Sequence, residues 1–278
     1  MFAKLYKYQV KELWYIARYF YLGMVGTYLI SMLIKATKIP GVVQFFNVLS
    51  ILGFILCGVA ILIFTVINDY QNQQGKRSYF FRSIPAKESA ILGSRIAYYA
   101  TYYFSTILMI VIGLTLRLIA DDATNMGIPF HIALNVYKDL FPITKMVGIM
   151  LFLVIYTGTE FIISMMFAIT IGSHAKFKSL GIGGPILVYF LHYIAMQIIN
   201  LISILFIPIA IKLPDNFDSG FKLEIVFQSM MPEINKLFSA QSNEIRVFGI
   251  GFIFITFVVW IIMLVWIYKF SKNKISLN

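Results

Sequence analysis

Charged side chains are scarce in this sequence. They make up 13% of its 278 residues, whereas hydrophobic residues make up 60%. A soluble globular domain needs more polar surface than that, so the composition indicates an integral membrane protein. Cysteine is almost absent as well. The single thiol, Cys57, excludes an internal disulfide, and its apolar surroundings favour a role in packing.

The motifs of self-sufficient enzymes are also missing. The sequence has no G-x-x-x-x-G-K-[ST] phosphate-binding loop, no G-x-S-x-G elbow, no H-E-x-x-H pair and no C-x-x-C pair. His131 and Asn135 have a spacing found in some metalloproteases, but no further ligands accompany them, so we expect no metal. The chain itself is therefore not predicted to be an enzyme, although a membrane enzyme acting on lipid or peptide stays open as an alternative.

What the sequence does contain is long apolar runs. A bilayer core of about 30 Å needs roughly 20 apolar residues in a helix. The runs lack the alternation of barrel strands, so each is predicted to be a helix. The predicted fold class is all-α integral membrane, with a six-helix transmembrane domain at 19–268. The six runs are 19–34, 43–67, 96–119, 146–171, 182–211 and 247–268.

Positive charge is distributed unevenly among the loops. If both ends of the chain lie on one side, the segments on that side hold 14 Lys or Arg and 3 acidic residues. Cytoplasmic segments carry the excess of Lys and Arg, so both termini are predicted to be cytoplasmic, with a basic tail at 269–278. Sidedness and anionic lipid account for the net charge of +11, so no nucleic acid partner is expected.

The first 18 residues have helical periodicity. Lys4, Lys7, Lys11 and Arg18 fall on one face, and apolar residues cover the opposite face. The pattern predicts an interfacial helix at 1–18, lying on the cytoplasmic leaflet with its apolar side down, before the chain turns into the first span. A basic anchor with no further role is the alternative.

Two outer loops are predicted to carry structure. Apolar residues from Phe130 to Phe141 recur every three or four positions, which predicts a short helix along the outer surface. The segment 212–246 is too amphipathic for a plain loop. Its apolar residues are expected to bury in the membrane interface or in a partial re-entry that protein shields.

Glu160 is the one full charge near the middle of a predicted span. A carboxylate at that depth is costly and should face protein or water. It could line a translocation path for cationic or polar cargo, or lock two helices together. The structural alternative is a protonated glutamate, or one paired with Thr157 and Thr159.

The cytoplasmic loop 68–95 is rich in charge although it lies between two strongly apolar runs. The stretch "RSIPAKESAILGSRIA" predicts a short helix that starts near Ser83 or Pro85 and leads back to the membrane. An apolar knob ringed by basic side chains suits insertion into a groove on a cytoplasmic protein. An amphipathic loop resting on anionic lipid is the alternative. The residues assigned to this surface are Tyr79, Phe80, Arg82, Ile84, Pro85, Lys87 and Glu88.

This layout resembles the membrane subunit of a type-2 ABC exporter. The interfacial helix ahead of six spans is similar to that family, and so is "FFRSIPAKESAILGSRIA" between the second and third spans. "SIPAK" stands where the family often shows Leu-Pro-Val-Ser-Arg, and the outer segment 212–246 is similar to its re-entrant element. The resemblance implies that residues 79–92 are a coupling helix, seated in a groove of a separate ATP-binding subunit.

The resemblance also implies a function. The partner subunit would bind ATP and Mg, this chain would bind no cofactor, and a second membrane subunit, identical or different, would complete the assembly in the lipid bilayer. Small bacterial permeases of this kind commonly export amphipathic peptides such as phenol-soluble modulins or lantibiotics. A multi-pass protein of the bacterial cell membrane is therefore expected. A membrane receptor, scaffold or immunity protein that transports nothing is the alternative.

Overall fold

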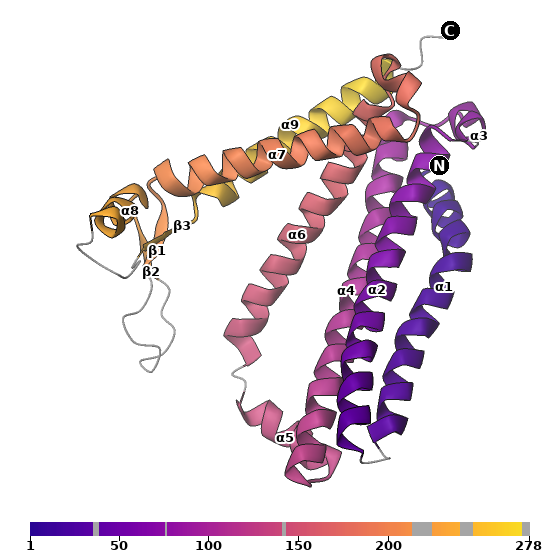
Figure 1. The fold of residues 1–278 in the computed structure, drawn as a ribbon. Coiled ribbons are helices and arrows are strands. Elements are labelled where there is room, and N and C mark those ends of the chain that lie inside the picture. The colour runs from indigo at the N-terminus through magenta and orange to yellow at the C-terminus, as the bar shows by residue number, and fades with distance from the viewer. Residues whose placement is uncertain (36–38, 76, 141–142, 213–223, 240–246, 274–278) are drawn as a thin grey trace. The chain divides into compact units, whose positions relative to one another are not determined.

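The computed structural model of this protein forms two compact units, Met1–Ile162 and Ile163–Asn278. Six helices are long and apolar enough to cross a membrane, in agreement with the prediction of an all-α membrane protein. These six are Phe2–Lys35, Gly41–Gln73, Glu88–Thr124, Gly148–Gly172, Gly183–Phe206 and Gly251–Ser271. The described residues are 1–35, 39–75, 77–140, 143–212, 224–239 and 247–273 (Figure 1).

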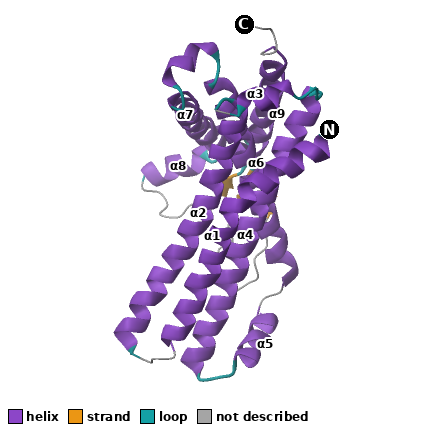
Figure 2. Cartoon of the chain, turned by 90° about the vertical axis from the view of Figure 1, so that its right-hand side faces the viewer, coloured by secondary structure: helices purple, strands orange, loops and turns teal. Residues whose placement is uncertain are grey.

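Three long helices form the body of unit 1. They are α1 (Phe2–Lys35), α2 (Pro40–Gln73) and α4 (Glu88–Met126), and they lie side by side in both ribbon views (Figures 1 and 2). At Gly58 the α2 backbone comes so close to α4 that an added side chain would run into Ile110. Close approach of this kind is typical of helices packed in a membrane.

Two short helices flank α4. α3 (Ser78–Ser83) precedes it, and α5 (Phe130–Leu140) follows it and packs against it. α4 ends because Gly127 adopts a left-handed conformation with φ of 65°, which glycine tolerates best. α5 confirms the short helix predicted after the third span, except that Phe141 lies outside the described residues.

α1 is a single helix that runs without a break through residue 18. The predicted surface helix at 1–18 is therefore not a separate element, because its hydrogen-bonded ladder continues into the first span. Leu5, Gln9, Leu13 and Ala17 are buried, and α1 packs against both α2 and α4. The apolar side that we expected to rest on lipid thus contacts protein over much of its length.

Unit 2 is built around α7 (Gly183–Phe206) and α9 (Gly251–Asn273), which pack against each other. The last turns of α6 (Ile143–Gly172) and a 3-10 helix, η1 (Ala175–Leu180), precede them. Pro185 lies in the first turn of α7, where proline costs no hydrogen bond.

A small antiparallel sheet, which the sequence did not predict, follows α7. Strand β1 (Ala210–Lys212) lies between β2 (Glu224–Val226) and β3 (Val247–Gly249), and Ile211 pairs with Ile225 on one side and Phe248 on the other. The expected fifth span is therefore too long, and the expected sixth span starts too early. The fifth ends at residue 206, and the sixth begins at residue 251 rather than 247.

The described part of the segment 212–246 contains β2 and a short helix, α8 (Met231–Phe238). Met230 is buried, whereas Ile225 and Phe227 are exposed. The described part of the segment is thus folded, as its amphipathic pattern indicated. Its burial in the membrane stays a prediction, and Phe221 and Leu223 lie outside the described residues.

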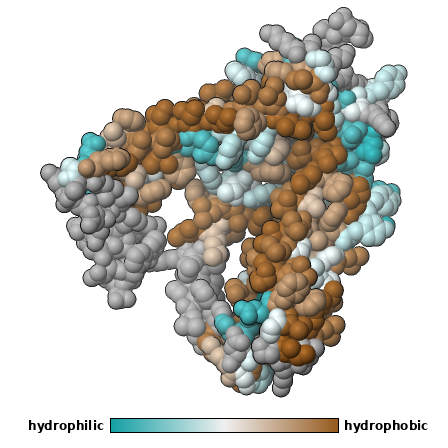
Figure 3. Space-filling model, viewed as in Figure 1, coloured by the Kyte–Doolittle hydropathy of each residue, from teal (hydrophilic) through white to brown (hydrophobic). Residues whose placement is uncertain are grey.

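Large apolar side chains cover the outside of the long helices. Figure 3 shows brown, apolar surface over α7 and over the turns of α1 and α2 that lie farthest from α3. Paler and teal side chains gather around α3 and the start of α1. A monomeric soluble protein does not expose apolar surface of this extent, so these faces contact lipid or other protein.

Candidate functional site

Charged and polar side chains meet at α3 and at the helix ends beneath it. Phe81 anchors α3, because it is buried and meets the ring of Tyr8 edge-on at 5.9 Å between ring centres. Two positions earlier, Tyr79 is 86% exposed. α3 therefore places one aromatic ring against α1 and presents another to its surroundings.

Arg77, directly before α3, links this helix to two others. Its guanidinium forms an ion pair with Glu12 of α1 and donates a hydrogen bond to Asn68 Oδ1 of α2 at 3.1 Å. Asn72 Nδ2 donates to the other oxygen of Glu12 at 3.2 Å, so α1 and α2 are joined here as well. These contacts fix the start of α3 relative to the long helices.

Beneath this layer lies a buried ion pair between α2 and α4. Arg95 donates to Asp69 through two nitrogens, Nε at 2.9 Å and Nη2 at 2.6 Å, and the two side chains are only 3% and 1% exposed. Tyr99 adds a third hydrogen bond to Asp69 at 3.1 Å. A paired geometry with extra donors is what allows two charges to be buried together.

Tyrosines continue this polar layer along α4. Tyr98 accepts a hydrogen bond from Asn68 and donates one to the Thr65 carbonyl at 3.2 Å, and Tyr102 donates to the Val10 carbonyl of α1 at 2.7 Å. Their rings contact one another edge-on. The hydroxyls satisfy polar groups while the rings fill the space between helices.

The sequence missed this network. Asp69, Arg95, Glu12 and Arg77 were treated as charges of cytoplasmic segments, whereas the structure brings them together at the ends of α1, α2 and α4. One signal was available. Asp69 and Arg95 are opposite charges that end the second apolar run and precede the third, which is where two antiparallel helices would meet.

The predicted coupling helix has different bounds in the structure. We expected a helix that starts near Ser83 or Pro85, but α3 ends at Ser83 and α4 starts at Glu88. Ile84 is extended, with φ of −72° and ψ of 120°, because the residue before a proline disfavours the helical conformation. Residues 79–92 therefore comprise most of α3, an extended link and the first turn of α4.

The predicted surface residues divide among these three parts. Tyr79, Phe80 and Arg82 belong to α3, and the side chains of the latter two lie outside the described set. Ile84, Pro85 and Lys87 form the link, with Ile84 half-buried and the other two exposed, and Glu88 is the first residue of α4. On α1, all four predicted cationic residues are exposed: Lys4, Lys7, Lys11 and Arg18.

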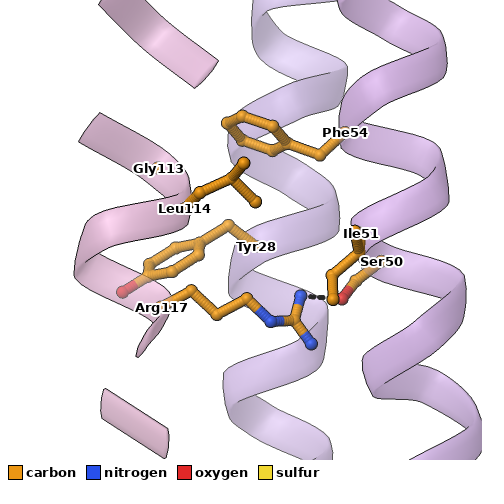
Figure 4. Close-up of a pocket in the computed structure, with 7 residues that line it drawn as sticks. All are labelled: Tyr28, Ser50, Ile51, Phe54, Gly113, Leu114 and Arg117. Atoms are coloured by element: carbon orange, nitrogen blue, oxygen red, sulfur yellow. Dashed lines mark hydrogen bonds between the residues drawn. The ribbon is translucent and has the colours of Figure 1, made fainter. Parts of the chain in front are cut away.

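A second charged cluster lies at the opposite end of the same helices, and Figure 4 shows its Arg117 pointing toward Ser50. Arg117 of α4 donates to Ser50 Oγ and, at 2.7 Å, to the Asn47 carbonyl of α2. Asp121 forms ion pairs with both Lys35 of α1 and Arg117. The pocket beside Arg117 has an accessible volume of about 10 Å³, the room that one water molecule needs, so it cannot hold cargo.

Glu160 is half-buried on α6. The two threonines proposed as its partners donate to their own helix, Thr157 to the Leu153 carbonyl at 2.8 Å and Thr159 to the Ile155 carbonyl at 2.7 Å. The role of Glu160 stays a prediction.

Unit 2 holds a polar contact that the sequence did not suggest. Ser164 Oγ lies 3.0 Å from His192 Nε2. Among the described residues no group of three or more His, Cys, Asp or Glu could hold a metal ion. The contact is therefore best described as a hydrogen bond between α6 and α7.

No protein-family model matches this chain, and comparisons with curated proteins and with solved structures found no match either.

Proposed function

We propose that this chain is the membrane subunit of an ATP-driven exporter, and that a separate ATP-binding subunit docks on α3. The observation that carries the proposal is Tyr79, a large aromatic side chain that is 86% exposed on a short helix anchored to the bundle. Exposed aromatic residues on a rigid support are typical anchors of protein interfaces.

The contacts beneath α3 support a role in force transmission. A docking element that moves the long helices must be attached to them more firmly than to its own flanking loops. Phe81 and Arg77 attach α3 to α1 and α2, and the Asp69–Arg95 pair attaches α2 to α4. A push on Tyr79 would therefore act on all three long helices.

The chain has no ATP-binding motif, which agrees with a motor in another chain. For the cargo we propose amphipathic peptides, because the chain is rich in Tyr, Phe and Met (17, 26 and 13 residues), and those within the spans can provide adaptable apolar contacts. A second membrane subunit would complete the path, and a bacterial cell membrane is the proposed location.

Gentle detergent purification of the tagged protein from its native membranes, with mass spectrometry of what stays bound, tests the proposal. A stoichiometric protein with a phosphate-binding loop is expected, and Tyr79→Asp is expected to release it. Phe238→Asp is the matched control, because Phe238 of α8 is 87% exposed and lies in unit 2.

Release by both variants would mean that the partner responds to general damage. If no ATP-binding protein is recovered even after mild cross-linking, the exporter proposal fails, and a receptor or scaffold that transports nothing becomes the leading proposal.

A further inference from the structure

One face of α1 changes character along its length. Because a helix turns by about 100° per residue, positions three and four apart share a face. Lys4, Lys7, Lys11 and Arg18 share the face that lies opposite the buried stripe of α1. The same face continues toward the other end of α1 with exposed aliphatic residues, which are Leu22, Val25, Leu29 and Leu33.

Aromatic residues lie where the basic part of this face meets the aliphatic part. Trp14, Tyr15 and Tyr19 are all exposed there. The guanidinium of Arg18 lies 5.5 Å from the ring centre of Tyr15 and 4.9 Å from that of Tyr19, and it donates a hydrogen bond to the Tyr19 hydroxyl at 3.0 Å. Rings of Trp and Tyr gather at the level of lipid headgroups.

The spacing of charges on α1 also places Arg18 at the level of the lipid headgroups. The uncharged residues 19–34 between Arg18 and Lys35 span about 24 Å at 1.5 Å per residue. Long Arg and Lys side chains reach outward from the ends of such a segment, so the two charges can bracket a hydrocarbon core of about 30 Å. Arg18 is thereby at one boundary of the membrane.

We propose that Arg18, held between Tyr15 and Tyr19, binds the phosphate of an acidic phospholipid, and that Lys4, Lys7 and Lys11 extend this basic surface. The Tyr19 hydroxyl takes one N–H of the guanidinium, and the other N–H groups can donate to phosphate oxygens. This reverses the orientation expected from the sequence. The apolar side of the N-terminal turns is buried against α2 and α4, and Arg18 with the rings beside it meets the lipid.

Lipid is the proposed occupant because the same face is aliphatic from Leu22 onward and would meet acyl chains in a bilayer, and a second membrane subunit is the alternative that the quenching experiment below tests. A protein partner at this place would have to cover the exposed leucines inside the hydrocarbon as well. The proposal does not depend on export. It concerns only α1 and would hold for a receptor as well as for a transporter.

The first experiment measures lipid retention. The protein is reconstituted in vesicles with equal amounts of phosphatidylglycerol and phosphatidylcholine, extracted gently and examined by native mass spectrometry. We expect wild type to retain phosphatidylglycerol preferentially and Arg18→Gln to reduce that preference about fivefold. Lys212→Gln, an equal change of charge at an exposed site in unit 2, should leave it unaltered. An equal preference in wild type and Arg18→Gln would overturn the proposal.

The second experiment locates the face directly. Trp260 and Trp266 are replaced with Phe, which leaves Trp14 as the single tryptophan. Brominated phosphatidylglycerol is expected to quench Trp14 more strongly than brominated phosphatidylcholine, and Arg18→Gln should abolish the difference. If neither lipid quenches Trp14, protein covers this face and the lipid site is excluded.

Discussion

The two charged clusters at the ends of unit 1 pair their charges differently. Near α3, one Asp69 meets one Arg95 through two hydrogen bonds, and both side chains are buried. At the other end, Lys35 and Arg117 share Asp121, whose side chain is 30% exposed. One cluster is a closed pair, and the other is a shared carboxylate within reach of water or headgroups.

The difference teaches where these helices are held firmly. A bidentate pair fixes both the distance and the rotation of α2 against α4, whereas a shared carboxylate can change partners at low cost. Between the clusters, α4 carries no charge from residue 96 to residue 116. We infer that the end near α3 is rigid and that the opposite end is the more adaptable one.

The strongest way to break the contrast is to remove one member of the closed pair. Asp69→Asn should lower the free energy of unfolding by about 3 to 5 kcal/mol, because it leaves a buried guanidinium without its counter-ion. Denaturant unfolding in detergent measures this. The double variant Asp69→Leu, Arg95→Leu should lose less than Asp69→Asn, and a larger loss in the double variant would contradict this account of the pair.

A smaller loss is expected from the third hydrogen bond of Asp69. Tyr99→Phe should cost about 1.5 kcal/mol, since the lost hydrogen bond has a charged acceptor. Tyr98→Phe is the comparison, because its hydroxyl donates to a neutral carbonyl at 3.2 Å. The same unfolding assay should rank Tyr99→Phe as the more destabilising change, and the reverse order would show that Asp69 does not need this donor.

At the other end, Asp121→Asn should cost about 1 kcal/mol, because water screens a carboxylate that is 30% exposed and Arg117 keeps its hydrogen bonds to α2. Unfolding in detergent is again the measurement. A loss as large as that of Asp69→Asn would remove the distinction between the two ends.

The smallest effect on stability is expected from Tyr79→Ala. An exposed ring contributes little to the folded state, so the free energy of unfolding should change by no more than about 0.5 kcal/mol. A larger loss would mean that Tyr79 packs within the protein. The Tyr79→Asp variant could then not distinguish loss of partner binding from loss of folding.

The sequence predicted the six spanning helices because each needs only a long apolar run, and such a run can be recognised from the local sequence alone. It predicted α5 because apolar residues there recur every three or four positions. It misplaced α3, since Pro85 was taken as the start of a helix while the extended Ile84 ends the previous one. A proline is compatible with either side of a helix boundary, so the local pattern could not decide.

The sheet and the buried network could not be predicted for a different reason. Three-residue strands carry no periodicity, and β1 lies in an apolar stretch that looks like the end of a span. Asp69 and Arg95 are 26 positions apart, and only the packing of α2 on α4 shows that they meet. Contacts between distant residues are set by tertiary packing, which no local window contains.

Because α1 is continuous, the number of residues between two positions sets their relative orientation around the helix axis. In an unbroken helix the angular position of Arg18 dictates that of Leu22, so neither face can be rotated alone. One residue inserted between them would turn the basic surface by about 100° relative to the aliphatic one, whereas seven would nearly restore the alignment. The continuous helix thus fixes the orientation of the surface that meets the headgroups relative to the surface that meets the acyl chains.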